Sequence, residues 1–347
     1  TKSSLITYGL VVLAYVVAEI FMKTGHMTSL LKGLLVPLCV YAILAVSLNL
    51  TVGILGELSL GHAGFMCVGA FTSAVFTKCM MHTITVPTVR FLLALLVGVV
   101  CAGICGVLIG IPVLRLRGDY LAIVTLAFGE IIKNLVNVIY LGRDSAGFHF
   151  SMKDIMALNM EPDGEVIIKG AQGITGAPTD SNFTLGIILL LITLFIVLNL
   201  IHSRAGRAIM SIRDNLIAAE SVGIRITRYK LMAFSISAAL AGVAGVLYAH
   251  NISTLTALPK NFGYNMSIMI LVFVVLGGIG NIRGSIIASV LLTLLPELLR
   301  GLKDYRMLIY AVVLIGMMLF NWAPACIQWR EKMAFKLKNM KKKEKKE

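Results

Sequence analysis

Charged residues are scarce in this sequence. Only 14% of its 347 residues are Asp, Glu, Lys or Arg, and 58% are hydrophobic. Soluble domains carry about 25% charged residues, so the composition argues against a soluble enzyme. The net charge of +14 would suit nucleic-acid binding on a solvated polar surface, but this chain has too few polar residues to build one. We therefore expect a lipid bilayer as its surroundings and no nucleic-acid partner.

The motifs of enzymes and metal sites are also missing from the sequence. It contains no G-x-x-x-x-G-K-[ST] phosphate loop and no Gly-Lys pair. Its six cysteines lie mostly in apolar runs, and none forms a CxxC or Cys/His cluster with zinc-site spacing. No paired carboxylates or nucleophile constellation points to catalysis. We expect no catalytic residue, no metal ligand and no cofactor bound by this chain.

Long apolar runs fill most of the chain. Taking 58% of 347 residues gives about 200 apolar residues, which at about 20 per spanning helix allows about ten spans. The runs are continuously apolar, which indicates helices and not the alternating strands of a barrel. We predict an all-α polytopic membrane protein with about 8–10 transmembrane helices. The predicted apolar segments are Leu5–Met22, Gly33–Val52, Leu58–Phe76, Phe91–Val113, Tyr120–Leu141, Phe183–Ile201, Leu231–His250, Met266–Gly280, Ser285–Leu299 and Met307–Trp322.

One apolar segment, Leu58–Phe76, is interrupted by small and polar residues. It contains Ser59, Gly61, His62 and Gly64. We expect a broken or re-entrant helix here. Such a break could present backbone amides to a substrate carboxylate, as part of a translocation path. The alternative is a tightly packed helix crossing in which glycine allows close approach and His62 bonds to a neighbouring carbonyl.

A second polar group lies inside the segment Tyr120–Leu141. Its members, which fall within an arc of about 100° on a helix, are Glu130, Lys133, Asn134 and Asn137. Charged groups in a membrane segment usually face a bundle interior or an aqueous cavity, and Lys133 can neutralise Glu130 at spacing i, i+3. The group is either a polar lining of the path or a polar lock between helices.

The segment His202–Lys230 is polar and basic and has no Pro or Gly between Arg207 and Ser221. Its apolar residues recur on one helical face, at Ile209, Ile212, Leu216 and Ala219. Gly223 follows at a suitable C-cap position. The pattern predicts one amphipathic cytoplasmic helix, which lies on the lipid surface or docks into a partner's groove.

The distribution of charge indicates the topology. Residues 330–347 carry nine basic and three acidic residues, whereas Gly142–Asn182 carries three basic and six acidic ones. Because Lys and Arg favour the cytoplasmic side, we expect both termini to be cytoplasmic and Gly142–Asn182 to be an extracytoplasmic loop. We thus divide the chain into a transmembrane permease domain, 1–329, and a basic cytoplasmic tail, 330–347.

Two short glycine-rich strings suggest an internal repeat. Gly53-Ile54-Leu55-Gly56 in the first half is similar to Gly278-Ile279-Gly280 in the second. Repeats built from broken, glycine-rich helices are typical of transporters.

Four strings in order carry a resemblance to a known family. They are LSLGHAGF at 58–65 with Gly69-Ala70, LRLRGDY at 114–120, RAIMSIRDNLIAAESVGI at 207–224, and GGIG at 277–280. Together they resemble branched-chain amino acid ABC importer permeases of the LivM type, in the LivH/LivM family. The third string is similar to the coupling segment of importer permeases, but it reads Ala-Ala-Glu where the general pattern reads Glu-Ala-Ala.

The resemblance implies a permease subunit in the bacterial plasma membrane that imports Leu, Ile or Val. It implies a second, LivH-like permease, two LivG/LivF-like ATPase subunits that bind ATP and Mg²⁺, and an extracytoplasmic binding protein. In the coupling segment, apolar side chains would pack in an ATPase groove and polar ones would contact its rim. These residues are Ile212, Arg213, Asp214, Leu216, Ala219, Glu220 and Gly223. The path would use Ser59, Gly61, His62, Gly64, Glu130, Asn134 and Asn137.

Two other functions compete with this one. A related importer permease for urea or short amides shares the same motifs. A proton-coupled secondary transporter could use Glu130 and His62 to carry protons. The coupling segment argues against the secondary transporter, because a self-powered carrier has no need of a docking helix.

Overall fold

The computed structural model describes residues 2–24, 29–81, 83–116, 118–144, 147–160, 164–299 and 305–322. The expected basic tail at 330–347 lies outside the described residues. The chain divides into two compact units, residues 1–290 and 291–347. All features of the candidate site belong to the first unit.

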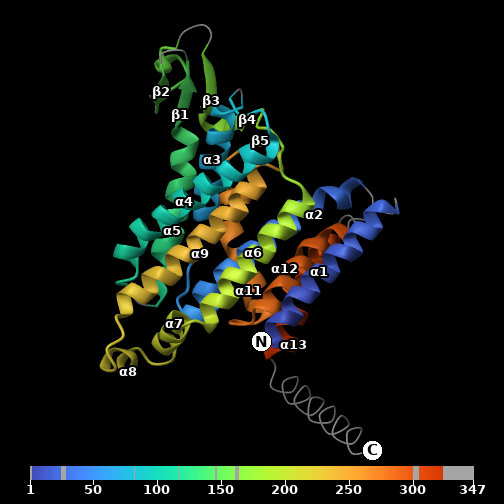
Figure 1. Ribbon diagram of the computed structural model, residues 1–347, viewed down its shortest axis with the longest axis vertical. Helices are drawn as coiled ribbons and strands as arrows, with labels where there is room; N and C mark the ends of the chain where they lie inside the picture. The colour runs from blue at the N-terminus through green and yellow to red at the C-terminus, as the bar shows by residue number, and fades with distance from the viewer. Residues whose placement is uncertain are drawn as a thin grey trace, which may run out of the picture. The chain divides into compact units, whose positions relative to one another are not determined.

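Helices dominate the described chain (Figure 1). Seven of the described helices are long and apolar enough to cross a membrane. Each of the ten predicted apolar segments contains a helix, and the all-α polytopic prediction is confirmed. The corresponding helices are α1 (Lys2–Lys23), α2 (Ser29–Asn49), α3 (His62–Cys79), α4 (Pro87–Val113), α5 (Asp119–Val138), α6 (Phe183–His202), α9 (Ile226–Ala249), α11 (Tyr264–Gly277), α12 (Ile282–Leu298) and α13 (Arg306–Trp322).

Helix α9 lies at the centre of the first unit, where it packs against α2, α3 and α4. Glycines make this packing close. A Cβ placed on Gly69 of α3 would stand 2.6 Å from Cα of Gly242 in α9, and one on Gly245 would overlap the carbonyl of Met66. Small residues let helix backbones approach one another in membranes. Glycine at these positions therefore allows α3 and α9 to pack closely.

The polar stretch Gly142–Asn182 is more ordered than the solvated loop that the sequence suggested. It contributes to a three-stranded antiparallel sheet of order β2-β1-β3, formed by β1 (Tyr140–Arg143), β2 (Phe148–Ser151) and β3 (Glu165–Lys169). A second sheet pairs β4 (Ile174–Thr175) with β5 (Thr254–Leu255). Figure 1 shows the strands at one end of the helices of this unit and α7 (Arg204–Asp214) and α8 (Leu216–Ser221) at the other. We call these the sheet end and the α7 end.

The interrupted segment around α3 runs the whole length of α9. Glu57, which precedes α3, pairs with Lys230 near the start of α9. Thr77, near the end of α3, bonds to His250 just past the end of α9. A helix of 24 residues is about 36 Å long, enough to cross the hydrocarbon core. The segment therefore follows α9 from one end to the other as a broken helix and does not fold back on itself.

Candidate functional site

The backbone is irregular between α2 and α3. Helix α2 continues into the π-helical turn η1 (Leu50–Leu55), which ends at Gly56 with φ of 81°. The chain is then non-helical until α3 begins at His62. Gly56 tolerates this left-handed conformation because it has no Cβ. π-Helical turns occur frequently at functional sites, so this break is the first place to look for one.

A chain of buried hydroxyls fixes the orientation of His62. Its Nε2 lies 3.0 Å from Oγ of Ser237 in α9, and Oγ1 of Thr51 lies 2.8 Å from the same atom. The Ser237 hydroxyl donates its own proton to the carbonyl of Ser47. His62 therefore bonds to a hydroxyl and not to the carbonyl that the packing interpretation expected.

Two polar atoms beside the break have no hydrogen-bond partner among the described residues. They are Oγ of Ser59 and Nδ1 of His62, on side chains that are buried. Buried polar atoms are nearly always paired, and each exception needs a physical explanation. Both atoms belong to the segment Leu58–Phe76, which the sequence predicted to form part of a translocation path.

Most backbone amides around the break are already bonded. Leu60 N donates to Oγ1 of Thr125 at 3.0 Å, and Ala63 N donates to Oγ of Ser267 at 3.2 Å. The next two amides of α3 both donate to the carbonyl of Gly61. These four amides are therefore not free to hold a substrate carboxylate.

Glycines at the start of α3 bring it against α5. A Cβ on Gly61 would stand 2.6 Å from the carbonyl oxygen of Thr125, and one on Gly64 would stand 2.7 Å from Cα of Gly129. This part of the segment is tightly packed, as the second interpretation predicted. The break thus combines a closely packed helix crossing with unpaired polar side chains.

The polar group of α5 mainly ties that helix to the chain before and within α11. Glu130 pairs with Lys133, and its Oε1 accepts a hydrogen bond from Tyr264 N at 2.7 Å. Asn137 donates from Nδ2 to the carbonyl of Ala257 at 3.1 Å. These contacts are those of a polar lock. Asn134 differs, because it is exposed on the surface of this chain.

The predicted single helix between Arg207 and Ser221 is two helices in the structure. Helix α7 ends at Asp214, and α8 begins at Leu216. Asn215 separates them, and its Oδ1 accepts a hydrogen bond from Ala218 N at 3.0 Å. Asn side chains compete with helical bonding in this way, which explains why the one-helix prediction is wrong.

The separation of α7 from α8 changes which side chains face outward at the α7 end. Ile212 and Ala219, predicted to fill a partner's groove, are each 3% exposed, and Leu216 is half-buried. Ile217 and Val222 instead are 78% and 74% exposed. One straight helix would place both residues away from its apolar face, so the sequence did not predict their role. Arg213, Asp214 and Glu220 are exposed, as expected for polar contacts.

Helix α7 packs directly beneath the break. Nη1 of Arg213 donates to the carbonyl of Gly53 in η1 at 2.9 Å. Its Cγ would lie 2.5 Å from a Cβ placed on Gly56. Ile209 of α7 is fully buried in a cluster with Leu50 and other residues of η1. The α7 end and the break are therefore one continuous packed structure.

The end of α8 has the cap that the sequence predicted. Gly223 has φ of 85°, a conformation that favours glycine. Ile224 N reaches back to the carbonyl of Ala219 at 3.1 Å, which closes the helix with a glycine C-cap. The prediction that Gly223 terminates this helix is confirmed.

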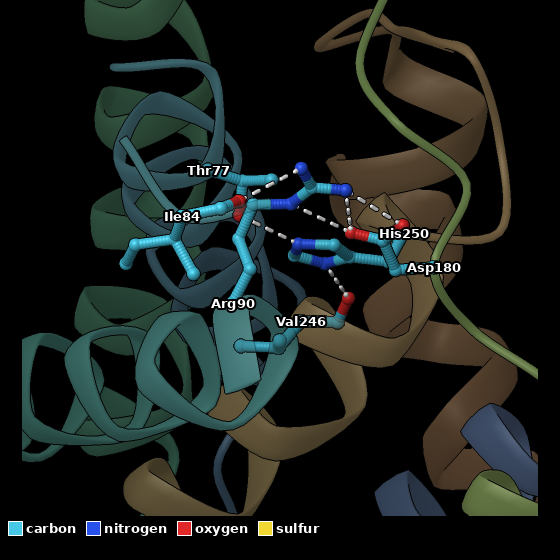
Figure 2. Close-up of polar contacts among 6 residues, drawn as sticks. All are labelled: Thr77, Ile84, Arg90, Asp180, Val246 and His250. Carbon is cyan, nitrogen blue, oxygen red and sulfur yellow. Dashed lines mark hydrogen bonds and ion pairs between the residues drawn. The ribbon is translucent and has the colours of Figure 1, made fainter. Parts of the chain in front are cut away.

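A buried ion pair at the sheet end was not found from the sequence (Figure 2). Nη2 of Arg90 lies 2.9 and 2.7 Å from the two carboxylate oxygens of Asp180, and Nε lies 3.0 Å from Oδ2. Both side chains are less than 10% exposed. Arg90 lies in the first turn of α4, directly before the predicted apolar segment Phe91–Val113, and this single charge at the edge of an apolar run is the sequence signal for the contact.

His250 completes this cluster beside the ion pair (Figure 2). Nδ1 lies 2.8 Å from the carbonyl of Val246, and Nε2 lies 2.8 Å from Oγ1 of Thr77. A carbonyl only accepts, so Nδ1 carries the proton and Nε2 accepts from Thr77. Burial lowers the pKa of His250, the Val246 carbonyl and Asp180 act against that shift, and Arg90 reinforces it. The cluster joins α3, α4 and α9 to the loop before α6.

Comparison with known proteins identifies the family. Residues 30–321 match the family model described as branched-chain amino acid transport system / permease component. The chain belongs to this family. It is 34% identical over 309 residues to the high-affinity branched-chain amino acid transport system permease protein LivM of Escherichia coli (strain K12), covering 86% of this chain and 70% of LivM.

More distant relatives of the permease are also permeases. The LivH protein of Salmonella typhimurium is 24% identical over 257 residues, covering 73% of this chain and 79% of LivH. The autoinducer 2 import system permease protein LsrC of Yersinia enterocolitica is 28% identical over 180 residues, 46% of this chain and 49% of LsrC. No solved structure gives a significant match. Together with its apolar helices, the family makes this permease a multi-pass membrane protein.

Proposed function

We propose that this chain is the permease subunit of an ATP-driven importer that moves branched-chain amino acids across the bacterial plasma membrane. The observation that carries the proposal is the 34% identity to LivM over 86% of the chain. The name of that relative states branched-chain amino acid transport, which favours this substrate class over urea or short amides. The chain's own part in the cycle is transport and not catalysis.

The proposed importer needs further subunits. A second, related permease completes the membrane part, and the similarity of this chain to LivH supports such a pair. Two ATPase subunits bind ATP and Mg²⁺, and an extracytoplasmic protein delivers the amino acid. Asn134 is exposed on α5 beside the exposed Ile131 and Leu135. Because a polar side chain is costly to expose to lipid, this face of α5 suits a contact with the second permease.

We place the ATPase contact at the α7 end, which then faces the cytoplasm together with both termini. Exposed Ile217 and Val222 supply an apolar docking surface, and Glu220 and Gly223 lie beside them. Arg213 connects this surface to η1 through the Gly53 carbonyl. Movement of α7–α8 with the ATPase would therefore reach the break before α3 through the Arg213–Gly53 hydrogen bond and through Ile209, which packs against η1.

The proposed path passes the break. Ser59 and His62 contribute unpaired polar atoms there, and Gly61 and Gly64 keep the backbone close to α5. Glu130 and Asn137 hold the neighbouring helices in place by their bonds to Tyr264 and Ala257, and we assign them a positioning role.

Reconstitution tests the function and its coupling surface. The permease is placed in liposomes with its partner permease, ATPases and binding protein, and uptake of leucine, isoleucine, valine and urea is measured with and without ATP. We expect ATP-dependent uptake of the three amino acids. Uptake of urea alone, or uptake without ATP, would overturn the proposal.

Ile217→Glu tests the docking surface. It should lower ATPase binding and uptake at least tenfold, because a charge replaces an apolar contact. Met156→Glu is the matched control, since Met156 is 89% exposed at the opposite, sheet end. Equal loss in both variants would place the ATPase contact elsewhere.

A further inference from the structure

We propose that Ser59 and His62 form a subsite for the zwitterionic head group of an α-amino acid in transit. In this subsite, Nδ1 of His62 accepts a hydrogen bond from the substrate ammonium, and the Ser59 hydroxyl donates to the substrate carboxylate. The inference rests on the proposed importer function and names the atoms by which that importer holds its substrate.

The tautomer of His62 follows from its neighbours. The Ser237 hydroxyl has one proton, which goes to the Ser47 carbonyl, because a carbonyl only accepts. Ser237 must therefore accept at its contact with Nε2 of His62, so Nε2 carries the imidazole proton. Nδ1 of this singly protonated ring is left as an acceptor. Only a ligand that brings an N–H or O–H donor satisfies it.

The Ser59 hydroxyl lies three residues before His62, in the non-helical stretch that leads into α3, and also has no partner among the described residues. Its side chain is 0% exposed and that of His62 is 1% exposed. Leaving two such buried groups unpaired is costly, which favours a ligand that meets both. An α-amino acid carries one donor group and one acceptor group on neighbouring carbon atoms.

The electrostatics of the break fit a dipolar head group. The turn η1 ends before the break, and the 18-residue helix α3 begins after it. The partial negative charge at the end of η1 therefore lies near the partial positive charge at the start of α3. A lone anion would depend on free amides, but Leu60, Ala63 and Gly64 have already given theirs to other acceptors. The unpaired Ser59 and His62 side chains remain available to recognise both groups of the substrate.

Two substitutions of His62 separate its two nitrogens. His62→Gln can keep a donor near Ser237 while removing the acceptor at the Nδ1 position. His62→Asn can keep an acceptor near the Nδ1 position while losing the bond to Ser237. In the complete reconstituted importer, we expect Ser59→Ala and His62→Gln to lower ATP-dependent leucine uptake about tenfold or more, the value of a lost hydrogen bond to a charged group. His62→Asn should retain more uptake than His62→Gln.

Thr125→Val and Ser267→Ala are the matched controls. Each removes one hydrogen bond to the backbone of the same turn and leaves Ser59 and His62 unchanged. We expect uptake within about threefold of the unaltered importer. Equal losses in the controls and in Ser59→Ala would show that the turn needs only intact packing, and would overturn the subsite.

A spectroscopic measurement on the unaltered importer does not depend on the folding of any variant. With ¹⁵N-labelled histidine, the Nδ1 resonance of His62 should shift when the importer is trapped with leucine and a non-hydrolysable ATP analogue. An unshifted resonance in an importer that transports leucine would overturn the subsite alone. Absence of leucine transport by the unaltered importer would instead overturn the proposed function.

Discussion

The buried ion pair at the sheet end gives the sharpest quantitative test of this structure. Arg90 and Asp180 make three short N–O contacts of 2.7 to 3.0 Å, and their side chains are 8% and 9% exposed. Removing one partner of a buried pair leaves the other charge without compensation, which costs about 3–5 kcal/mol. We expect Arg90→Ala and Asp180→Ala each to lower the free energy of unfolding by about that amount.

The assay is an unfolding titration of the purified full-length permease in mixed micelles with increasing SDS. The double variant removes both charges, so it should lose less stability than the sum of the two single losses. The pair Glu19–Lys23 is the matched control, because its atoms are 3.8 Å apart and its side chains are 32% and 78% exposed. Lys23→Ala should change the stability by less than about 0.5 kcal/mol, because surface pairs contribute little.

Additive losses for Arg90 and Asp180 would refute the assignment of a coupled buried pair. Losses no larger than that of Lys23→Ala would mean that the pair is open to water in the folded protein. In either case the loop before α6 would not be held to α4 by charge.

Three further predictions address other parts of the fold. Acidification should destabilise the sheet end, because burial lowers the pKa of His250 below its ordinary value of about 6.5. The stability that neutral His250 contributes is fully present above pH 6.5 and is lost as the pH falls below it. Thermal unfolding between pH 8 and 5 measures this loss, and stability that rises on acidification would contradict it. Gly53→Ala should cost at least about 1–3 kcal/mol, because its Cβ would overlap the backbone of Gly280, whereas Gly33→Ala meets nothing within 4 Å and should be neutral in the same SDS titration. Gly223→Ala should cost about 1–2 kcal/mol because φ there is 85°, and an unchanged unfolding midpoint would show that α8 does not depend on this cap.

The sequence predicted the helices well because the signal for a membrane helix is strong and local. The ten apolar segments were recognisable without information about their neighbours, and each contains a helix. Glycine next to polar residues likewise marked the break before α3. Gly223 was recognisable as a cap because its position relative to α8 is a local property.

Features that depend on competing or distant contacts could not be read in the same way. Asn215 splits α7 from α8 because its side chain bonds to Ala218 N, an alternative that periodicity does not reveal. Asp180 lies 90 residues after Arg90, so their pairing required the fold. The tautomer that makes His62 Nδ1 an acceptor depends on Ser237, 175 residues away, and on the bond of Ser237 to the Ser47 carbonyl.

The two glycine strings that suggested an internal repeat lie close together in the structure. Asn49 joins them, since its Oδ1 accepts from Gly280 N at 2.9 Å and its Nδ2 donates to Oγ of Ser285 at 2.9 Å. Gly53 lies against the same turn, too close for a side chain. Arg213 binds the carbonyl of Gly53, so a displacement of α7 would act on the turns of both halves through one contact. Similar strings in the two halves therefore meet where a force from the α7 end would enter the helices.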